Sequence, residues 1–512
     1  MSENESSALL KIFTGGSIML VGLGFELVAS FGAKLLIARF LGPLNYGGVI
    51  IGLTVMSLTC SVIGLGLNQG IGRYLPRFDG IQQRRGVLVS GFRLGLTSAV
   101  VAGAIMYLSA PAIANLIFDD PSLEPILRLF ALGVPCWILV QLAVGTVQGM
   151  EQSFPRVYIE NFTLPLVRFG GFAVVVVFGL GAVGAAGAYL VSYVAAGAVS
   201  IWYIAKRTPL FSFGTEYVPK GRTLLRFSIP VALSSVVSLV YHDIDTVLLG
   251  YYMSANEVGI YNVVYPLGQL LLIGLQAIGF VFMPVLSRLH SAGAQRDMEQ
   301  LYQTIVKWIF TGTLPLFLVI ALFPEMTLLI TFGEEYLPGA ASLSVLSVGF
   351  LVHATAGPTS NILTSTGETR LLLYNSIATA VLNLLLNVLL IPQYSYLGAA
   401  IATVCSYLLL NLLNSIQVYR TSNIHPISYE FVVPSAIGTV IAGVIYVVTS
   451  SLSNVTVPVL VAAFIVFIAL YAVAVVRFGI RENEIELVLH LEETHDLDLG
   501  PFKKIANAVM KT

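Results

Sequence analysis

The sequence predicts an all-α integral membrane protein with about 14 transmembrane helices. Three observations support this class: the composition, the length of the apolar runs, and a repeat between the two halves of the chain. Of the 512 residues, 56% are hydrophobic and only 10% are charged, whereas soluble globular domains carry about 25% charged residues. Because the formal net charge is −1, we expect no nucleic-acid partner.

Each predicted helix is a run of about 20 mostly apolar residues, the length that crosses a bilayer. The predicted spans are residues 13–37, 47–70, 87–112, 126–149, 157–179, 182–205, 224–250, 259–284, 304–331, 339–364, 371–391, 396–419, 430–450 and 457–477. The runs are continuously apolar and do not alternate, so helices are favoured over the strands of a membrane barrel.

Lysine and arginine mark alternate loops of this series. They follow spans two, four, six, eight, ten and twelve and recur in the C-terminal tail, whereas the other loops hold almost none apart from Arg39. Positively charged loops remain on the cytoplasmic side of the membrane. We therefore predict a multi-pass protein of the cell membrane with both termini in the cytoplasm.

Two passages recur at nearly the same offset in the two halves. GAAGAYLVSY (184–193) aligns with GAAIATVCSY (398–407) at an offset of 214, and FLGPLNYGGV (40–49) aligns more weakly with YMSANEVGIY (252–261) at 212. Each unit then holds six spans, and an even number makes the repeat parallel, as in transporters that work by alternating access.

The repeat divides the chain into two bundles with additions at the C-terminal side. The predicted parts are a cytoplasmic N-terminus (1–12), an N-terminal six-helix bundle (13–205), a cytoplasmic linker (206–222), a C-terminal six-helix bundle (223–420), two further helices (430–478) and a cytoplasmic tail (479–512).

The segment ARFLGPLNYGG (38–48) resembles the R-x-L-G-P-x-x-Y-G signature of the polysaccharide-transporter branch of the MOP flippase superfamily, which includes the Wzx-type oligosaccharide flippases. DIDTVLLGYYMSANEVGIYNVVYPL (243–267) resembles the passage between spans seven and eight of that family. The resemblance covers nearly the whole chain and implies a MOP/MATE-like architecture. The implied activity is translocation of a polyprenyl-linked oligosaccharide, joined through phosphate or pyrophosphate, from the cytoplasmic to the outer leaflet for polysaccharide or glycoprotein glycan assembly.

The same resemblance suggests the partners. We expect a lipid-linked oligosaccharide as cargo, contact with membrane lipids, an association with glycan-assembly enzymes, and a monomer. We expect no cofactor and no metal, because Cys60, Cys136 and Cys405 all lie in apolar segments, and H⁺ or Na⁺ is the expected coupling ion.

Cations inside the predicted spans are the first candidates for cargo binding. A phosphate or pyrophosphate headgroup needs positive partners in a low-dielectric zone, and the planar fork of arginine suits phosphate. Arg168 is the best-placed candidate and Arg93 the second, with Lys34 in span one. The alternatives are that Arg168 pairs with Glu26 or Asp245, and that Lys34 extends outward to the interface.

Carboxylates inside the spans are the candidates for ion coupling. Ser234, Ser238, Tyr241 and Asp245 share one face of span seven and make a polar stripe, which we predict to line the cargo-binding cavity. Asp245, Glu26 and Asp243 are the predicted coupling residues, and Glu26 also joins the candidate cavity lining. The alternatives are a structural pair for Asp245 and a headgroup position for Asp243.

Spans ten to twelve carry neutral polar groups. We interpret His353 as a hydrogen-bonded packing residue rather than a proton relay. Five asparagines polarise spans eleven and twelve, namely Asn375, Asn383, Asn387, Asn411 and Asn414. Contacts with sugar hydroxyls and hydrogen bonds between helices both remain open, and the second use is the more common.

Other function classes fit less well, so we predict a transporter and no enzyme. A membrane glycosyltransferase or ligase needs acidic residues on a substantial outer loop, and the longest one, near 114–124, has only Asp119, Asp120 and Glu124. No Gly-Lys dipeptide occurs, which excludes a phosphate-binding P-loop. A cation-coupled multidrug exporter of the MATE branch is the closest alternative, but buried arginines disfavour cationic cargo.

Overall fold

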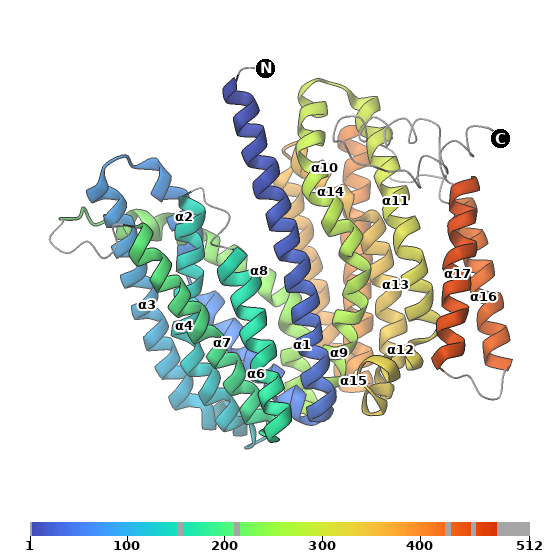
Figure 1. The fold of residues 1–512 in the computed structure, drawn as a ribbon, viewed down its shortest axis with the longest axis horizontal. Coiled ribbons are helices and arrows are strands. Elements are labelled where there is room, and N and C mark those ends of the chain that lie inside the picture. The colour runs from blue at the N-terminus through green and yellow to red at the C-terminus, as the bar shows by residue number, and fades with distance from the viewer. Residues whose placement is uncertain (1–2, 151–156, 209–215, 425–431, 452–456, 479–512) are drawn as a thin grey trace. The chain divides into compact units, whose positions relative to one another are not determined.

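The computed structural model describes residues 3–150, 157–208, 216–424, 432–451 and 457–478, and every regular element in these ranges is helical (Figure 1). The α-helices are α1 (Glu3–Ile63), α2 (Leu67–Tyr74), α3 (Ile81–Ala112), α4 (Leu123–Gly149), α6 (Leu164–Phe178), α7 (Gly181–Arg207), α8 (Gly221–Tyr252), α9 (Ala255–Gln269), α10 (Ile273–Ser291), α11 (Gln295–Leu322), α12 (Pro324–Thr331), α13 (Ala340–Ala356), α14 (Pro358–Ser365), α15 (Thr369–Ser422), α16 (Val432–Ser451) and α17 (Val457–Phe478). A π-helical segment, η3 (Val157–Thr163), leads directly into α6. The predicted tail and the middle of the predicted linker lie outside the described residues.

These helices account for the fourteen predicted spans. Two helices contain two spans each, because α1 breaks at Gly42 (φ 70°) and α15 breaks at Ser395 (φ 52°). Span eight is α9 continued by α10, and span ten is α13 continued by α14. The predicted all-helical membrane class is confirmed, and large apolar side chains such as Leu108 (78% exposed) cover outer surfaces of the helices, as expected for contact with lipid.

The predicted second and ninth spans need a correction. The sequence predicts one helix over 47–70, but α1 ends at Ile63, Leu65 and Gly66 adopt left-handed conformations, and α2 begins at Leu67. The sequence predicts one helix over 304–331, but α11 ends at Leu322 and α12 begins at Pro324. Proline disfavours a helical conformation in the residue before it, and Phe323 accordingly leaves the helix with φ −124° and ψ 50°.

The described residues group into two compact units. One comprises residues within 1–263, 332–336 and 384–399, and the other comprises residues within 264–331, 337–383 and 400–512. The first unit contains α1 to α8, and the second contains α10 to α14, α16 and α17.

The signature segment forms a turn and a close helix contact inside the first unit. Gly42 adopts φ 70°, which glycine accepts without strain, and Tyr46 is almost fully buried. A Cβ atom at Gly47 would lie 1.6 Å from the Ala255 carbonyl oxygen, and one at Gly259 would lie 1.9 Å from the Pro43 carbonyl oxygen. Only glycine fits at Gly47 and Gly259.

This contact is reciprocal in the repeat. Gly259 follows Gly47 by 212 residues, and Ala255 follows Pro43 by the same 212. Gly47 therefore packs against Ala255, and Gly259 packs against Pro43, which is the residue equivalent to Ala255 in the other copy. Such an exchange is the pattern of a two-fold contact between like surfaces. The weaker of the two sequence repeats thus marks equivalent backbone positions.

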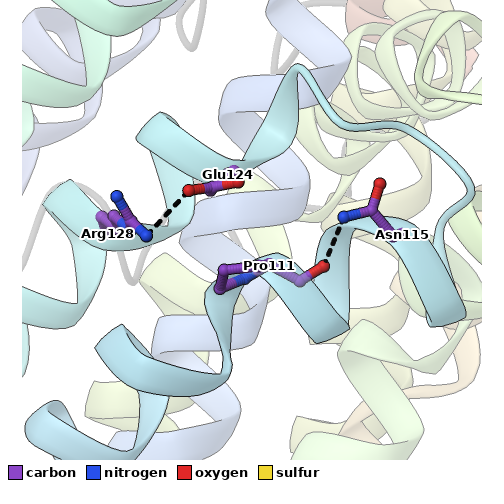
Figure 2. A network of polar contacts seen from close by, with 4 residues as sticks. All are labelled: Pro111, Asn115, Glu124 and Arg128. Carbon is purple, nitrogen blue, oxygen red and sulfur yellow. Dashed lines mark hydrogen bonds and ion pairs between the residues drawn. The ribbon is translucent and has the colours of Figure 1, made fainter.

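The acidic residues of the segment between α3 and α4 are used locally (Figure 2). Glu124 Oε1 lies 2.8 Å from Arg128 Nη2, and Asn115 donates a 2.7 Å hydrogen bond to the Pro111 carbonyl. Asp120 accepts hydrogen bonds from the backbone N–H and the hydroxyl of Ser122. Only the Asp120–Ser122 contacts lie in the turn between the helices, and the other two are within single helical stretches.

Candidate functional site

A pair of cations lies in the first unit, at the packing of α1 against α6. Lys34 and Arg168 are both half-buried and close enough that the positive charge of Arg168 acts on Lys34. In the described part of the chain, neither has a carboxylate within ion-pair distance, so the predicted alternative of an Arg168–Glu26 or Arg168–Asp245 pair is not observed. Cargo binding at Lys34 and Arg168 stays a prediction.

Aromatic side chains from α7 hold the guanidinium of Arg168. Its Cζ atom lies 4.5 Å from the ring centroid of Tyr189 and 5.7 Å from that of Tyr193. The two tyrosines are four residues apart and therefore share a face of α7. The close approach depends on small residues, since a Cβ at Gly171 would lie 2.8 Å from Cβ of Ala188. Cation–π stacking positions the guanidinium and leaves its N–H groups able to bind oxygen atoms.

The register of α1 against η3 and α6 explains why Lys34 and Arg168 meet. Phe25 stacks on Phe162 at 4.5 Å between ring centroids, and the atom nearest to a Cβ at Gly32 is on Phe169, at 3.8 Å. Residue numbers thus rise together along both helices, so spans one and five run in the same direction. That direction agrees with the predicted alternation of spans.

Glu26 lies on the same interface as the cations, about two turns before Lys34. The side chain of Glu26 is half-buried, and its Oε2 accepts a 2.5 Å hydrogen bond from Asn161 Nδ2. The structure thus places a carboxylate on the same helix as Lys34.

Asp245 occupies a different environment in the same unit. It is 3% exposed and accepts hydrogen bonds from Tyr261 Oη at 2.7 Å and from Asn387 Nδ2 at 2.6 Å. These donors come from α9 and α15, so the carboxylate links three helices. This geometry favours the structural alternative for Asp245, and its role in ion coupling stays a prediction.

The remaining residues of the predicted stripe receive less support. Ser234, Ser238 and Tyr241 belong to α8, but their side chains lie outside the described ones. Asp243 is half-buried and has an interaction partner. Arg93 is exposed on α3 and does not join Lys34 and Arg168.

Neutral polar groups of the second unit bond to one another. His353 stacks on Tyr407 with 4.3 Å between ring centroids, and its Nδ1 lies 3.3 Å from Asn411 Oδ1. Asn375 donates to Asn414 Oδ1 and to Gln417 Oε1, each at 2.7 Å. The hydrogen bonds of Asn375 and Asn411 thus join helical segments. This is the more common of the two uses that the sequence analysis left open for these asparagines.

Sequence reasoning missed the aromatic partners of Arg168. Tyr189 and Tyr193 lie inside the repeat passage 184–193, so their importance for packing was visible, but their contact with span five depends on tertiary structure. The usable signal was two tyrosines four residues apart on an otherwise small-residue helix.

Comparison with known proteins identifies the family. The family model described as "Polysaccharide biosynthesis protein" matches residues 36–341, which is more than half of the chain. The chain belongs to this polysaccharide biosynthesis protein family. The match includes the signature segment, Arg168 and the passage around Asp245, so the resemblance inferred from the sequence is confirmed.

A curated relative carries a functional description. The chain is 26% identical over 190 residues to the "Probable low-salt glycan biosynthesis flippase Agl15" of Haloferax volcanii, a match that covers 36% of this chain and 40% of that protein. The chain spans about two fifths of the length of the first curated relatives it matches.

Solved structures share the fold over most of the chain. A structure of the lipid II flippase MurJ in an inward closed conformation superposes with a TM-score of 0.74 and 14% identity, covering 88% of this chain and 96% of that one. An inward-facing multidrug resistance MATE family transporter of the MOP superfamily superposes with a TM-score of 0.63 and 16% identity, covering 78% and 94%. The polysaccharide biosynthesis protein described here therefore has the MOP superfamily fold.

Proposed function

We propose that this multi-pass membrane protein translocates a polyprenyl-linked oligosaccharide, joined by phosphate or pyrophosphate, from the cytoplasmic to the outer leaflet. The family and the MOP fold support a transporter of lipid-linked glycan rather than an enzyme. Both termini are assigned to the cytoplasm on the distribution of lysine and arginine, and the protein works by alternating access.

One observation carries the proposal. Lys34 and Arg168 form a half-buried cation pair without a carboxylate in ion-pair distance, and aromatic rings hold the guanidinium in place. Two adjacent cations in a low-dielectric region are costly unless an anion visits them. A phosphate or pyrophosphate headgroup supplies that anion and matches the donor geometry of arginine.

The energy source is part of the same proposal. Glu26 lies on the helix that carries Lys34, and we assign its carboxylate as the site of the coupling proton or Na⁺. One elementary charge that crosses about 100 mV supplies roughly 2.3 kcal/mol. Asp245 is the second candidate for this ion site.

A cation-coupled drug exporter is the competing candidate, because a MATE transporter shares the fold. Organic cations are repelled by Lys34 and Arg168, so the electrostatics of the first unit oppose this cargo. An exporter of this kind would lower the sensitivity of cells to cationic drugs, whereas the proposed flippase leaves that sensitivity unchanged.

The test begins with purified protein in vesicles that carry a glycan-linked polyprenyl diphosphate in both leaflets. Protein-dependent access of an external glycosidase to the inner-leaflet pool measures translocation. We expect fast exchange with the protein and slow exchange with empty vesicles. Equal rates in both samples would contradict the proposal, as would rapid uptake of a cationic dye with no movement of the glycolipid.

A further inference from the structure

A cavity lies in the first unit, and nothing above assigns it a role. It has a volume of about 290 Å³ and is lined by the end of α1, by α2 and by α4. Its main polar lining consists of Ser57, Ser61, Asn68, Gln69 and Gln141, with the indole of Trp137 on one wall. None of the described side chains that line it carries a charge.

The local sequence builds this lining from two helix faces. Ser57 and Ser61 are four residues apart on α1, and Trp137 and Gln141 are four residues apart on α4, so each pair shares a face. Gly145 brings the third wall close, because a Cβ there would lie 2.2 Å from the Asn68 carbonyl oxygen.

Hydrogen-bonding groups of this cavity remain available. Asn68 Nδ2 donates to Gln141 Oε1 at 3.2 Å, which fixes the orientation of the Gln141 amide. The Gln141 N–H groups and the hydroxyls of Ser57 and Ser61 have no hydrogen-bond partner in the described part of the chain. Planar amides and hydroxyls beside an exposed aromatic face are the groups that bind sugar hydroxyls and the apolar face of a sugar ring.

The cavity and the cation pair are linked through aromatic rings. The ring centroid of Trp137 lies 5.3 Å from that of Tyr193, and Tyr193 lies 5.7 Å from Cζ of Arg168. Tyr193 therefore contacts both the Trp137 wall of the cavity and the guanidinium of Arg168.

We propose that this cavity binds an uncharged sugar ring of the glycan, while Lys34 and Arg168 bind the phosphate that links glycan to lipid. The described lining has no cation to pair with a phosphate, and its neutral hydroxyls and amides fit an uncharged hexose or acetylated amino sugar. This assignment rests on the proposed function, and it makes the cavity the part of the protein that distinguishes one glycan from another.

The first test compares two cargoes in vesicles: polyprenyl diphosphate that carries a neutral trisaccharide, and bare polyprenyl diphosphate. Gln141→Leu removes the amide but keeps a similar volume. We expect it to slow the glycosylated cargo about tenfold, the effect of losing one or two hydrogen bonds, and to leave the bare carrier unchanged. Equal slowing of both cargoes, or slowing of neither, would overturn the proposal.

Gln148→Leu is the matched control, because Gln148 is an exposed residue of α4 that does not line the cavity. It should leave both cargoes unchanged. Arg168→Gln should slow both cargoes, since both carry the diphosphate. This pattern separates the sugar subsite from the phosphate site.

The second test measures binding without translocation. The chain has three tryptophans, so the background Trp202→Phe with Trp308→Phe leaves Trp137 as the reporter. Titration with maltose, lactose and an N-acetylglucosamine disaccharide should change its fluorescence saturably with at least one of them, and Gln141→Leu should weaken that response about tenfold. A response absent with all three sugars would overturn the sugar subsite. A saturable response in a protein that moves no glycolipid would instead reject the proposed flippase and keep the sugar site.

Discussion

The two copies of the repeat place a tyrosine at equivalent positions, but its surroundings differ between them. Tyr193 and Tyr407 are separated by the 214-residue offset, and both are 4% exposed. Tyr193 packs against Trp137 and Arg168, whereas Tyr407 stacks on His353. His353 follows Trp137 by 216 residues, so the aromatic partner also recurs at nearly the same place.

The cations have no counterpart in the second copy. A shift of 214 residues takes Lys34 to Leu248 and Arg168 to Leu382, and the polar groups near Tyr407 are the amide of Asn411 and the imidazole of His353. The two copies therefore share a buried tyrosine with an aromatic partner and differ in the charge at these positions.

The largest expected effect tests the shared scaffold. Gly47→Ala and Gly259→Ala each force a Cβ into a backbone carbonyl oxygen, which cannot rotate away as a side chain does. We expect each to destabilise the fold by more than about 3 kcal/mol, measured as loss of the monodisperse peak in fluorescence-detected size exclusion. Gly443→Ala is the control, because nothing lies within 4 Å of its Cβ position. If Gly47→Ala lost its monodisperse peak and Gly259→Ala kept it, the interpretation of the two contacts as equivalent would be wrong.

The next effect tests the difference in charge. Arg168→Gln should lower the rate of glycolipid exchange in vesicles about 100-fold, because it removes charge-assisted hydrogen bonds worth about 1.5–3 kcal/mol to the phosphate. His353→Gln makes the matched change beside Tyr407 and should alter the rate by less than about threefold. Similar losses in both variants would mean that the two copies contribute equally to cargo binding.

Lys34→Gln should have a smaller effect, of about tenfold, because Arg168 still provides bidentate contacts. Lys34→Arg should keep most of the rate, since it keeps the charge. Arg128→Gln serves as control, because Arg128 is neutralised by Glu124 in an ion pair at 2.8 Å. If Arg128→Gln lowered the transport rate as much as Lys34→Gln, the absence of an ion pair at Lys34 would not explain the effect of Lys34→Gln.

The smallest effect on transport is expected at Asp245. Asp245→Asn exchanges an acceptor for an amide N–H group that faces the donors Tyr261 and Asn387. We expect a loss of about 1–3 kcal/mol in the free energy of unfolding, seen as a lower melting temperature, with transport and its ion dependence retained. Transport that no longer responds to the H⁺ or Na⁺ gradient would assign ion coupling to Asp245 and refute the structural interpretation.

The helices were predictable because membrane insertion is a local property. Each span is long and apolar, and the breaks at Gly42 and Ser395 fall between predicted spans. The errors at spans two and nine arose because apolar length was given more weight than local breakers: Leu65 and Gly66 interrupt span two, and Pro324 separates the two helices of span nine.

The candidate site was predicted only in part. Arg168 and Lys34 were identifiable from the sequence because positively charged side chains are rare in apolar spans. Their proximity to one another, the stacking on Tyr189, and the burial of Asp245 between neutral donors depend on which helix faces meet.

By itself, the sequence determined the class, the family, the number of spans, the repeat and the residues able to carry charge in the membrane, since these follow from composition and local spacing. Tertiary structure alone decided that Lys34 joins Arg168 without a carboxylate, that Asp245 is enclosed by Tyr261 and Asn387, and that an uncharged cavity opens beside Trp137. Different helices make these contacts, two of them between residues more than 100 positions apart, Lys34 with Arg168 and Asp245 with Asn387. The register of the helices is fixed by close packing at small residues such as Gly47 and Gly171 rather than by any local pattern.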